Sequence, residues 1–181
     1  MSSHRDEYAQ RQGERQLRAI MNEDILAGEM KRAKRIYLDV CCLNRPFDDL
    51  SQERVRLEAE AVKSVLVLIG TRQWVGVGSE AIDFEIGRMP DPDRQLEVAL
   101  ITSGFSEYIT IGEPERQRGL EWESFGFGSL DALHLACAEK AGADVLLTTD
   151  DLLLRKAGRY VTNLTVRVAN PWTWLEEVLR R

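Results

Sequence analysis

Ile36-Tyr37-Leu38-Asp39-Val40 is an apolar run interrupted by one carboxylate, and it predicts the first strand of a parallel sheet. From this run onward, short apolar segments alternate with longer amphipathic segments, which is the pattern of βαβ units. A buried charge without a partner is costly, so a carboxylate inside such a strand needs a reason. Asp39 is therefore the residue for which the expected burial is by itself enough to indicate a functional role.

The segments after this strand predict an α/β fold with a parallel sheet of about five strands. Further strands are expected near 74–77, 108–111, 144–148 and 164–168. Helices are expected over about 51–69, 79–86, 93–103, 113–122 and 130–141, then after Asp150 and after Asn170-Pro171. A loop is expected through Asn44-Arg45-Pro46, while Ser79 and Ser129 are expected to cap the helices that follow them.

Length and composition are those of one globular domain. The chain has 181 residues, of which 44% are hydrophobic and 30% are charged. The longest apolar run, Val65-Leu66-Val67-Leu68-Ile69, is far shorter than the ~20 residues needed to cross a bilayer, and no signal peptide is recognisable at the N-terminus. We therefore expect a cytoplasmic protein without a membrane partner.

Residues 1–35 are predicted to form a charged N-terminal extension, helical or flexible, ahead of a domain over residues 36–181. The extension has one thin helical stripe of apolar residues: Leu17, Ile20, Met21, Ile25 and Leu26. A weakly docked appendage and a partner-binding helix both remain open as interpretations.

The charge distribution does not exclude a nucleic-acid partner. The net charge is −6, but residues 1–35 carry +2 and residues 36–181 carry −8. Basic surfaces favour nucleic acid through counterion release, whereas an enzyme that gathers carboxylates around a metal is shifted toward acidity. The three cysteines, Cys41, Cys42 and Cys137, lack metal-site spacing and are expected to be small hydrophobic residues.

Three further carboxylates fall near the ends of predicted strands or the starts of helices. They are Glu85, Asp131 and Asp150, and together with Asp39 they would form an acidic pocket if the fold brings them together. Carboxylates from several segments are typical of Mg²⁺ and Mn²⁺ sites. Each also has a structural interpretation: Asp150 as an N-cap, Asp131 as a first-turn acid and Glu85 as a solvated helix residue.

Two of these assignments have competitors nearby. Glu80 and Asp83 lie on the same predicted helix as Glu85, and Asp151 directly follows Asp150. His134, one turn after Asp131, is expected to be a packed or hydrogen-bonding histidine rather than a base or ligand.

At these residues the chain resembles the PIN-domain nucleases, a family that includes the VapC-like toxins of toxin–antitoxin pairs. The resemblance spans about residues 36–181. It rests on Tyr37-Leu38-Asp39, Asn44-Arg45-Pro46, Glu85-Ile86, Asp131-Ala132-Leu133-His134-Leu135-Ala136, Leu146-Leu147-Thr148-Thr149-Asp150 and Asn170-Pro171. Each motif is weak alone, but their order and spacing are fairly specific.

The resemblance implies a three-layer α/β/α fold with a PIN-like sheet and a Mg²⁺- or Mn²⁺-dependent endoribonuclease site. Asp39, Glu85, Asp131 and Asp150 would be the metal-binding and catalytic acids. Thr148 would support their loop by hydrogen bonding, and Asn44 or Arg45 would contact the substrate or the ligands.

The resemblance also implies partners and leaves alternatives open. RNA would be the substrate, and an antitoxin protein would be the partner if the chain is a toxin rather than a housekeeping ribonuclease. A homodimer is compatible with Trp172, Trp174 and the apolar face of 51–69. The main alternative is a catalytically idle PIN-fold module that binds RNA or protein.

Overall fold

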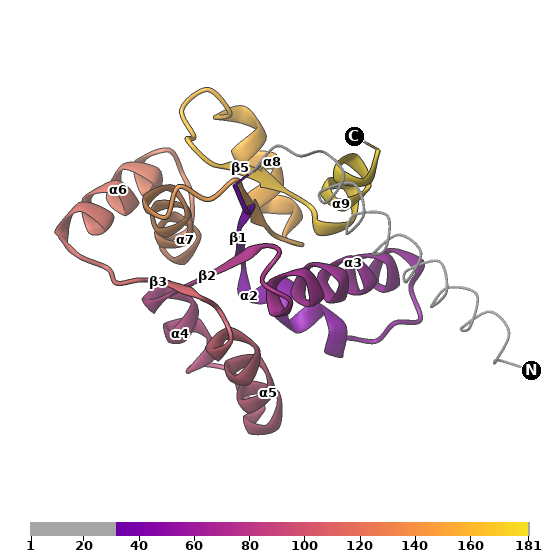
Figure 1. The fold of residues 1–181 in the computed structure, drawn as a ribbon. Coiled ribbons are helices and arrows are strands. Elements are labelled where there is room, and N and C mark those ends of the chain that lie inside the picture. The colour runs from indigo at the N-terminus through magenta and orange to yellow at the C-terminus, as the bar shows by residue number, and fades with distance from the viewer. Residues whose placement is uncertain (1–31, 181) are drawn as a thin grey trace, which may run out of the picture.

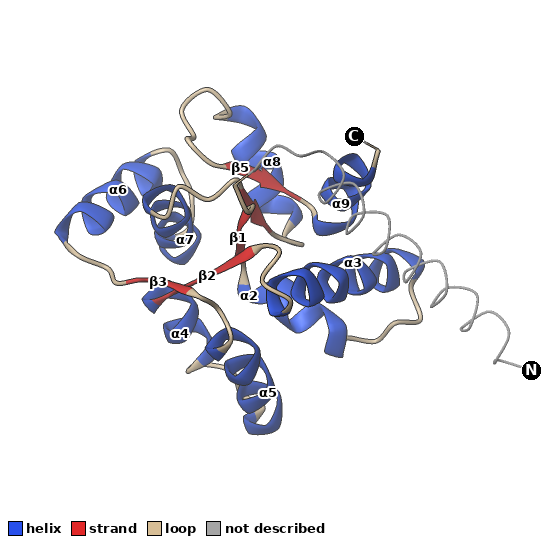
Figure 2. Cartoon of the chain, in the orientation of Figure 1, coloured by secondary structure: helices blue, strands red, loops and turns tan. Residues whose placement is uncertain are grey.

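Five parallel strands form the centre of the molecule in the computed structural model, which describes residues 32–180 (Figures 1 and 2). The strands are β1 (Arg35–Leu38), β2 (Val75–Ser79), β3 (Glu107–Ile109), β4 (Val145–Leu147) and β5 (Arg167–Ala169). Their order in the sheet is β3-β2-β1-β4-β5, and all neighbouring pairs are parallel. The predicted α/β class with a five-stranded parallel sheet is confirmed.

Helices cover both faces of this sheet. In chain order they are α2 (Val40–Asn44), α3 (Glu53–Gly70), α4 (Glu80–Ile86), α5 (Pro92–Ser103), α6 (Glu113–Ser124), α7 (Ser129–Lys140), α8 (Asp151–Arg159) and α9 (Pro171–Leu179). Helices α3 and α9 pack together on one side, and α6 and α7 pack together on the other (Figure 1). The fold is therefore three-layered, as predicted.

The core is built around the two central strands. Ile36, Tyr37 and Leu38 of β1 and all three residues of β4 are completely buried. Strands covered on both faces have continuous apolar sequences instead of alternating ones, which is why these runs were recognisable.

The strand order positions a ligand site. From β1 the chain moves outward to β2 and β3, and then returns across the sheet to β4 on the other side of β1. This reversal is the switch point at which open α/β sheets bind ligands, beyond the carboxyl ends of the strands. Asp39 follows the last residue of β1 and so lies at this point.

The predicted loop through Asn44-Arg45-Pro46 is wrong. Val40–Asn44 forms α2, and Arg45–Phe47 continues as a 3₁₀ turn. The first turn begins because the carbonyl of Asp39 accepts the backbone N–H of Cys42 at 2.9 Å. Its apolar residues Val40, Cys42 and Leu43 are buried, so tertiary packing stabilises a helix too short to show periodicity.

Most predicted caps are confirmed, and one is corrected. The Ser79 hydroxyl accepts the N–H of Ile82, and the Asn170 side chain accepts the N–H of Trp172. Ser129, however, is the first residue of α7, and Gly128 occupies the cap position with extended backbone angles. The carbonyl of Gly128 accepts the N–H of Ala132, so the helix begins one residue earlier than predicted.

Other element ends differ from prediction by a few residues. The last strand, expected near 164–168, covers Arg167–Ala169, because its register is set by pairing with Val145–Leu147. The predicted apolar stripe of residues 17–26 lies outside the described residues. Within residues 32–180, the helices are all too short or too polar to cross a bilayer.

Candidate metal centre

Asp39 is held at the end of β1 with its carboxylate turned away from its own backbone. Its N–H donates to the carbonyl of Leu147 in β4 at 3.0 Å, and its backbone angles are extended. Although it occupies the cap position of α2, its side chain does not cap that helix. Only 6% of the residue is exposed. Asp39 is therefore a buried carboxylate that does not serve the adjacent helix.

Neutral donors hold one oxygen of this carboxylate. The Thr148 hydroxyl donates to Asp39 Oδ2 at 2.8 Å, and the Cys41 thiol donates to the same oxygen at 3.1 Å. The Thr148 oxygen also accepts the backbone N–H of Asp150 at 3.0 Å. These bonds fix the carboxylate and the loop after β4 without adding positive charge.

Glu85 is the residue of α4 that faces this carboxylate. Its Oε2 lies 2.9 Å from His134 Nε2. The two competing acids have other partners, because Glu80 accepts the N–H of Ile111 and Asp83 accepts the hydroxyl of Tyr108. The helix geometry thus places Glu85, rather than Glu80 or Asp83, beside Asp39.

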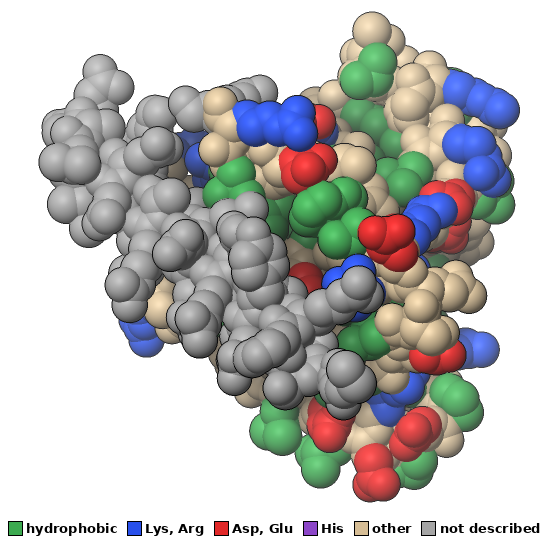
Figure 3. Space-filling model, turned by 90° about the vertical axis from the view of Figure 1, so that its right-hand side faces the viewer, with side chains coloured by type: hydrophobic (Ala, Val, Ile, Leu, Met, Phe, Trp, Pro, Cys, Tyr) green, Lys and Arg blue, Asp and Glu red, His purple; other side chains and the backbone are tan. Residues whose placement is uncertain are grey.

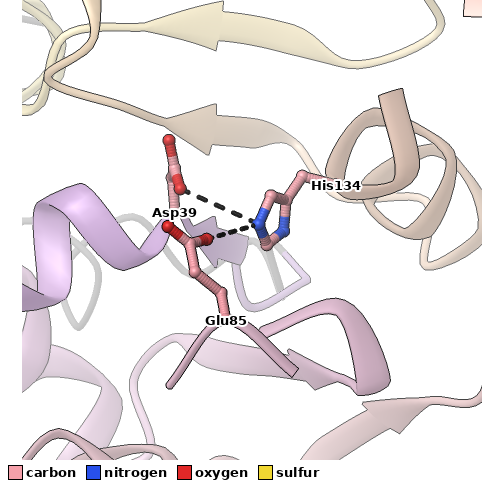
Figure 4. Close-up of side chains that lie close together, drawn as sticks. All are labelled: Asp39, Glu85 and His134. Carbon is pink, nitrogen blue, oxygen red and sulfur yellow. Dashed lines mark hydrogen bonds and ion pairs between the residues drawn. The ribbon is translucent and has the colours of Figure 1, made fainter. Parts of the chain in front are cut away.

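His134 completes a close group on α7, where only 1% of the residue is exposed. Its Nε2 lies 4.0 Å from Asp39 Oδ1 and 2.9 Å from Glu85 Oε2, so the ring points at both carboxylates (Figure 4). One ligand atom from each of the three residues lies within 4.8 Å of the others. The structure therefore brings together two of the four predicted acids with a histidine between them.

The charge of this group affects the pKa of Asp131. Partial burial and the negative charges of Asp39 and Asp150 raise the pKa of the Asp131 carboxyl, against smaller opposing effects of His134 and Lys156. A carboxyl whose pKa is raised by neighbouring carboxylates marks a site with surplus negative charge. Its position in the first turn of α7 agrees with the structural interpretation as well.

Asp150 is the N-cap of α8. Its Oδ1 accepts the backbone N–H groups of Leu152 at 2.6 Å and Leu153 at 3.2 Å. Its competitor Asp151 is exposed and forms a two-bond ion pair with Arg54. Asp150 thus caps a helix through one oxygen, and its N–H donates to the Thr148 hydroxyl that also holds Asp39.

The pKa of His134 also indicates an excess of negative charge around this group. Burial lowers its pKa, but the hydrogen bond to Glu85 and the charges of Asp39, Glu85 and Asp131 outweigh burial, so the pKa lies above its usual value. The negative charge of the nearby carboxylates therefore favours the protonated form of this imidazole.

Asn44 and Arg45 follow Asp39 in the chain within α2 and the 3₁₀ turn after it, and Arg45 belongs to a second polar group centred on Glu58. The Glu58 carboxylate, which is 1% exposed, lies 3.1 Å from Arg45 Nε, and it accepts from Arg54 and from the amide of Asn170. Asn44 donates to the carbonyl of Val40, and its buried Oδ1 has no hydrogen-bond partner. These two residues are thus fixed by protein contacts close to α2.

Two polar contacts of the site escaped sequence reasoning. Cys41 is half-buried and bonds to Asp39, and the buried Tyr37 hydroxyl lies 2.7 Å from both Ser79 Oγ and His134 Nδ1. Tyr37 was detectable in principle, since a tyrosine inside a strand buried on both faces needs a partner for its hydroxyl. The cysteine gave no comparable signal. Cys42 and Cys137 are buried, as expected for small hydrophobic residues.

Away from the pocket, charges of both signs share the surface. On the face seen from the right of Figure 1, acidic and basic side chains are interspersed with hydrophobic ones (Figure 3). Opposite charges also pair across elements, as between Arg167 and Glu177 or between Arg54 and Asp151. These paired charges contrast with the like charges gathered around Asp39 and Glu85.

No protein-family model matches the sequence, and no curated protein matches it either. Among solved structures, the chain is similar to the crystal structure of VapBC2 from Rickettsia felis bound to a DNA fragment from their promoter. The match has a TM-score of 0.47 and 13% identity, covering 75% of this chain and 98% of that one. Similarity at this level does not assign the chain to a family.

Proposed function

We propose that this chain is a metal-dependent endoribonuclease, in which Asp39, Glu85, Asp131 and Asp150 hold Mg²⁺ or Mn²⁺. One observation carries the proposal: Asp39 and Glu85, from different elements, converge with His134 at the carboxyl edge of the sheet, with ligand atoms within 4.8 Å. The raised pKa of Asp131 supports a wider acidic pocket that includes Asp131 and Asp150.

The residues present fit a divalent cation. Asp39 is buried, its oxygen Oδ2 is held by neutral donors, and its Oδ1 faces Glu85 and His134. Burying carboxylates beside each other is unfavourable unless a positive charge compensates. Carboxylates spread over several elements are the usual ligands of Mg²⁺ and Mn²⁺.

When bound, such a metal would supply an activated water and stabilise charge on the phosphate oxygens. The chain's own residues would do the positioning. The Thr148 hydroxyl bonds to both the Asp39 carboxylate and the backbone N–H of Asp150, which holds these two residues together. The Glu85–His134 bond orients the Glu85 carboxylate.

The choice of RNA as substrate rests on the resemblance to the PIN-domain nucleases, at Tyr37-Leu38-Asp39, Glu85-Ile86, Asp131–Ala136 and Leu146–Asp150. The same resemblance supports a toxin that pairs with an antitoxin protein. Asn44 and Arg45, fixed by α2 and Glu58, are the proposed contacts to substrate.

Metal binding separates this proposal from a catalytically idle module that binds RNA or protein. We expect MnCl₂ and MgCl₂ to raise the melting temperature of the metal-free protein, because an ion that binds only the folded state stabilises it by about 2.7 kcal/mol at 100 times its Kd. Absence of both a thermal shift and a calorimetric binding signal would remove the basis of the catalytic proposal.

Cleavage of RNA is the direct test. Asp39→Asn and Asp131→Asn should each lower metal-dependent cleavage by at least about 100-fold, because several kcal/mol of transition-state stabilisation depend on the ion. Asp93→Asn, at an exposed position in the first turn of α5, is the matched control and should cleave normally. Circular dichroism should show all three variants folded. Cleavage that persists after the metal is chelated would contradict the assignment. Cleavage that persists in both Asp39→Asn and Asp131→Asn would contradict it as well.

A further inference from the structure

The orientation of His134 sets it apart from a histidine that is only packed. Its ring is buried, yet both nitrogens have specific partners: Nδ1 lies 2.7 Å from the Tyr37 hydroxyl, and Nε2 points at the two carboxylates. Figure 4 shows Nε2 directed at Asp39 and at Glu85 of α4. Tyr37 of β1 contacts the other nitrogen, so residues from several elements determine the orientation of the His134 ring.

The distances around Nε2 match those of atoms that share an ion. Two ligand atoms each about 2.1 Å from one ion lie ~3.0 Å apart when adjacent and ~4.2 Å apart when opposite. The separations of Nε2 from Glu85 Oε2 and from Asp39 Oδ1 are 2.9 and 4.0 Å. The side chains therefore need little movement to surround a cation.

We propose that His134 is itself a metal ligand through Nε2, and that the site consequently takes a first-row transition metal such as Mn²⁺ or Co²⁺ in preference to Mg²⁺. This inference rests on the metal site of the proposed function and specifies the ion. Imidazole nitrogen is a good ligand for transition metals, whereas Mg²⁺ takes oxygen ligands and keeps several waters.

The proton balance of this step can be followed along one hydrogen-bonded chain. Nε2 must lose its proton to solvent when the metal–nitrogen bond forms, which leaves a neutral ring protonated on Nδ1. Nδ1–H then donates to the Tyr37 oxygen, and the Tyr37 hydroxyl donates to Ser79 Oγ at 2.7 Å. Metal-bound histidines commonly donate their second N–H in this way, which fixes the ring for coordination.

The alternative role for His134 is that of an internal cation. A doubly protonated ring donating to Glu85 and attracting Asp39 would offset part of the negative charge of the site. It would then compete with a metal instead of binding one. The two roles predict opposite effects of removing the imidazole, since loss of a ligand weakens Mn²⁺ binding and loss of a competing cation strengthens it.

Spectroscopy on the full-length protein without RNA distinguishes these roles. We expect pulsed electron paramagnetic resonance of the Mn²⁺ complex to show coupling to a directly bound ¹⁴N nucleus. The chain has only one other histidine, His4, so His4→Gln is the matched control and should keep the signal. His134→Gln, which offers an amide oxygen in place of Nε2, should lose it.

Calorimetry provides a second readout. The ratio of Mn²⁺ to Mg²⁺ affinity should fall at least about tenfold in His134→Gln relative to wild type and to His4→Gln. An unchanged ratio, tighter Mn²⁺ binding by His134→Gln, or a Mn²⁺ complex without nitrogen coupling would overturn the inference. If His134→Gln does not fold, the spectra of wild type and His4→Gln decide the question alone.

The outcomes also separate this inference from the proposed function. Metal-dependent RNA cleavage without nitrogen coupling overturns the histidine ligand and leaves the nuclease standing. Nitrogen coupling without any RNA cleavage supports the ligand and counts against the nuclease. Binding of Mg²⁺ but not Mn²⁺ overturns the histidine ligand alone, and failure to bind either ion overturns both.

Discussion

Tyr37 is a core side chain that contacts the candidate metal centre through its hydroxyl. Its ring is completely buried within β1, and burial raises the pKa of its hydroxyl well above the usual value, so the hydroxyl keeps its proton. That hydroxyl lies between Ser79 Oγ and His134 Nδ1. A protonated hydroxyl can accept the Nδ1–H of His134 while it donates its own proton to Ser79 Oγ, which suits a ring that coordinates through Nε2.

Tyr37→Phe should lower Mn²⁺ affinity by about 10–100-fold while the fold is retained, because the ring still fills its space and only the hydroxyl that bonds to His134 Nδ1 and Ser79 Oγ is lost. Isothermal titration calorimetry measures the affinity. Tyr160→Phe, which changes a tyrosine packed against Phe125 and Phe127, is the control and should bind Mn²⁺ normally. Equal affinities in wild type and Tyr37→Phe would show that the hydroxyl does not support the ligand.

Residue by residue, sequence reasoning identified the acids better than their surroundings. Asp39 was predictable because a carboxylate in an apolar strand conflicts with burial. The proximity of Asp39 and Glu85 could be expected only in general terms, because acids near the ends of parallel strands gather at one edge of the sheet. The contacts of Cys41, Tyr37 and His134 could not be predicted from the sequence. The Tyr37–His134 bond, for example, joins residues 97 positions apart and depends on packing.

At the scale of elements, the starts of helices were best predicted from their capping residues. Ser79, Asp150 and Asn170 each accept backbone N–H groups two or three residues ahead, so local sequence is enough to indicate their role. Helix α2 has no such signal in its sequence. It is five residues long and exists because its apolar side chains reach the core.

Gly76 shows a constraint between elements that local sequence does not reveal. It lies in β2 opposite Ile36, and a Cβ atom there would come within 2.6 Å of the Phe105 ring and 2.8 Å of Ile69 Cγ2. Gly76→Ala should therefore destabilise the protein by about 1–3 kcal/mol in urea unfolding.

Gly70→Ala is the matched control for this substitution. Gly70 is the last residue of α3, and a Cβ atom there would meet no atom within 4 Å. Alanine should be neutral or stabilise the protein by up to ~1 kcal/mol. Gly76→Ala with unchanged stability would show that β2 and the segment before β3 are less tightly packed than the structure indicates.

At the scale of the molecule, Glu139 connects parts of the chain on the α6–α7 side of the sheet. Its carboxylate accepts from Arg118 of α6, from the indole of Trp122 and from the backbone N–H of Thr165 ahead of β5. Although burial raises the pKa of Glu139, these bonds and the charge of Arg118 outweigh burial and lower it. This connection holds α6, α7 and the approach to β5 in one body.

The lowered pKa fixes the direction of a pH effect. A carboxyl with a depressed folded-state pKa contributes stability above its unfolded pKa of about 4.3, and that stability is lost as pH falls through the folded-state value. Glu139→Gln should lower the free energy of unfolding at pH 7 by about 1–3 kcal/mol and should reduce the loss of stability between neutral and acidic pH.

Glu121→Gln is the control for this pair, because Glu121 contacts the same Arg118 from an exposed position. Exposed ion pairs are worth less than about 1 kcal/mol, so its stability at pH 7 and its acid sensitivity should stay near wild type. Urea unfolding at pH 7 and pH 4 measures both variants. Equal behaviour of the two would show that Glu139 is not a structural connection.

The strand order also determines when the centre exists during synthesis. Asp39 is made early, but its partners on α7 and after β4 follow much later, Thr148 by 109 positions. Chains emerge from the ribosome N-terminus first, so a nascent chain that stops before β4 contains the first carboxylate without its hydroxyl donor and without the second neighbour of β1. If the chain is a ribonuclease, incomplete copies of it are harmless to the RNA from which they are being translated.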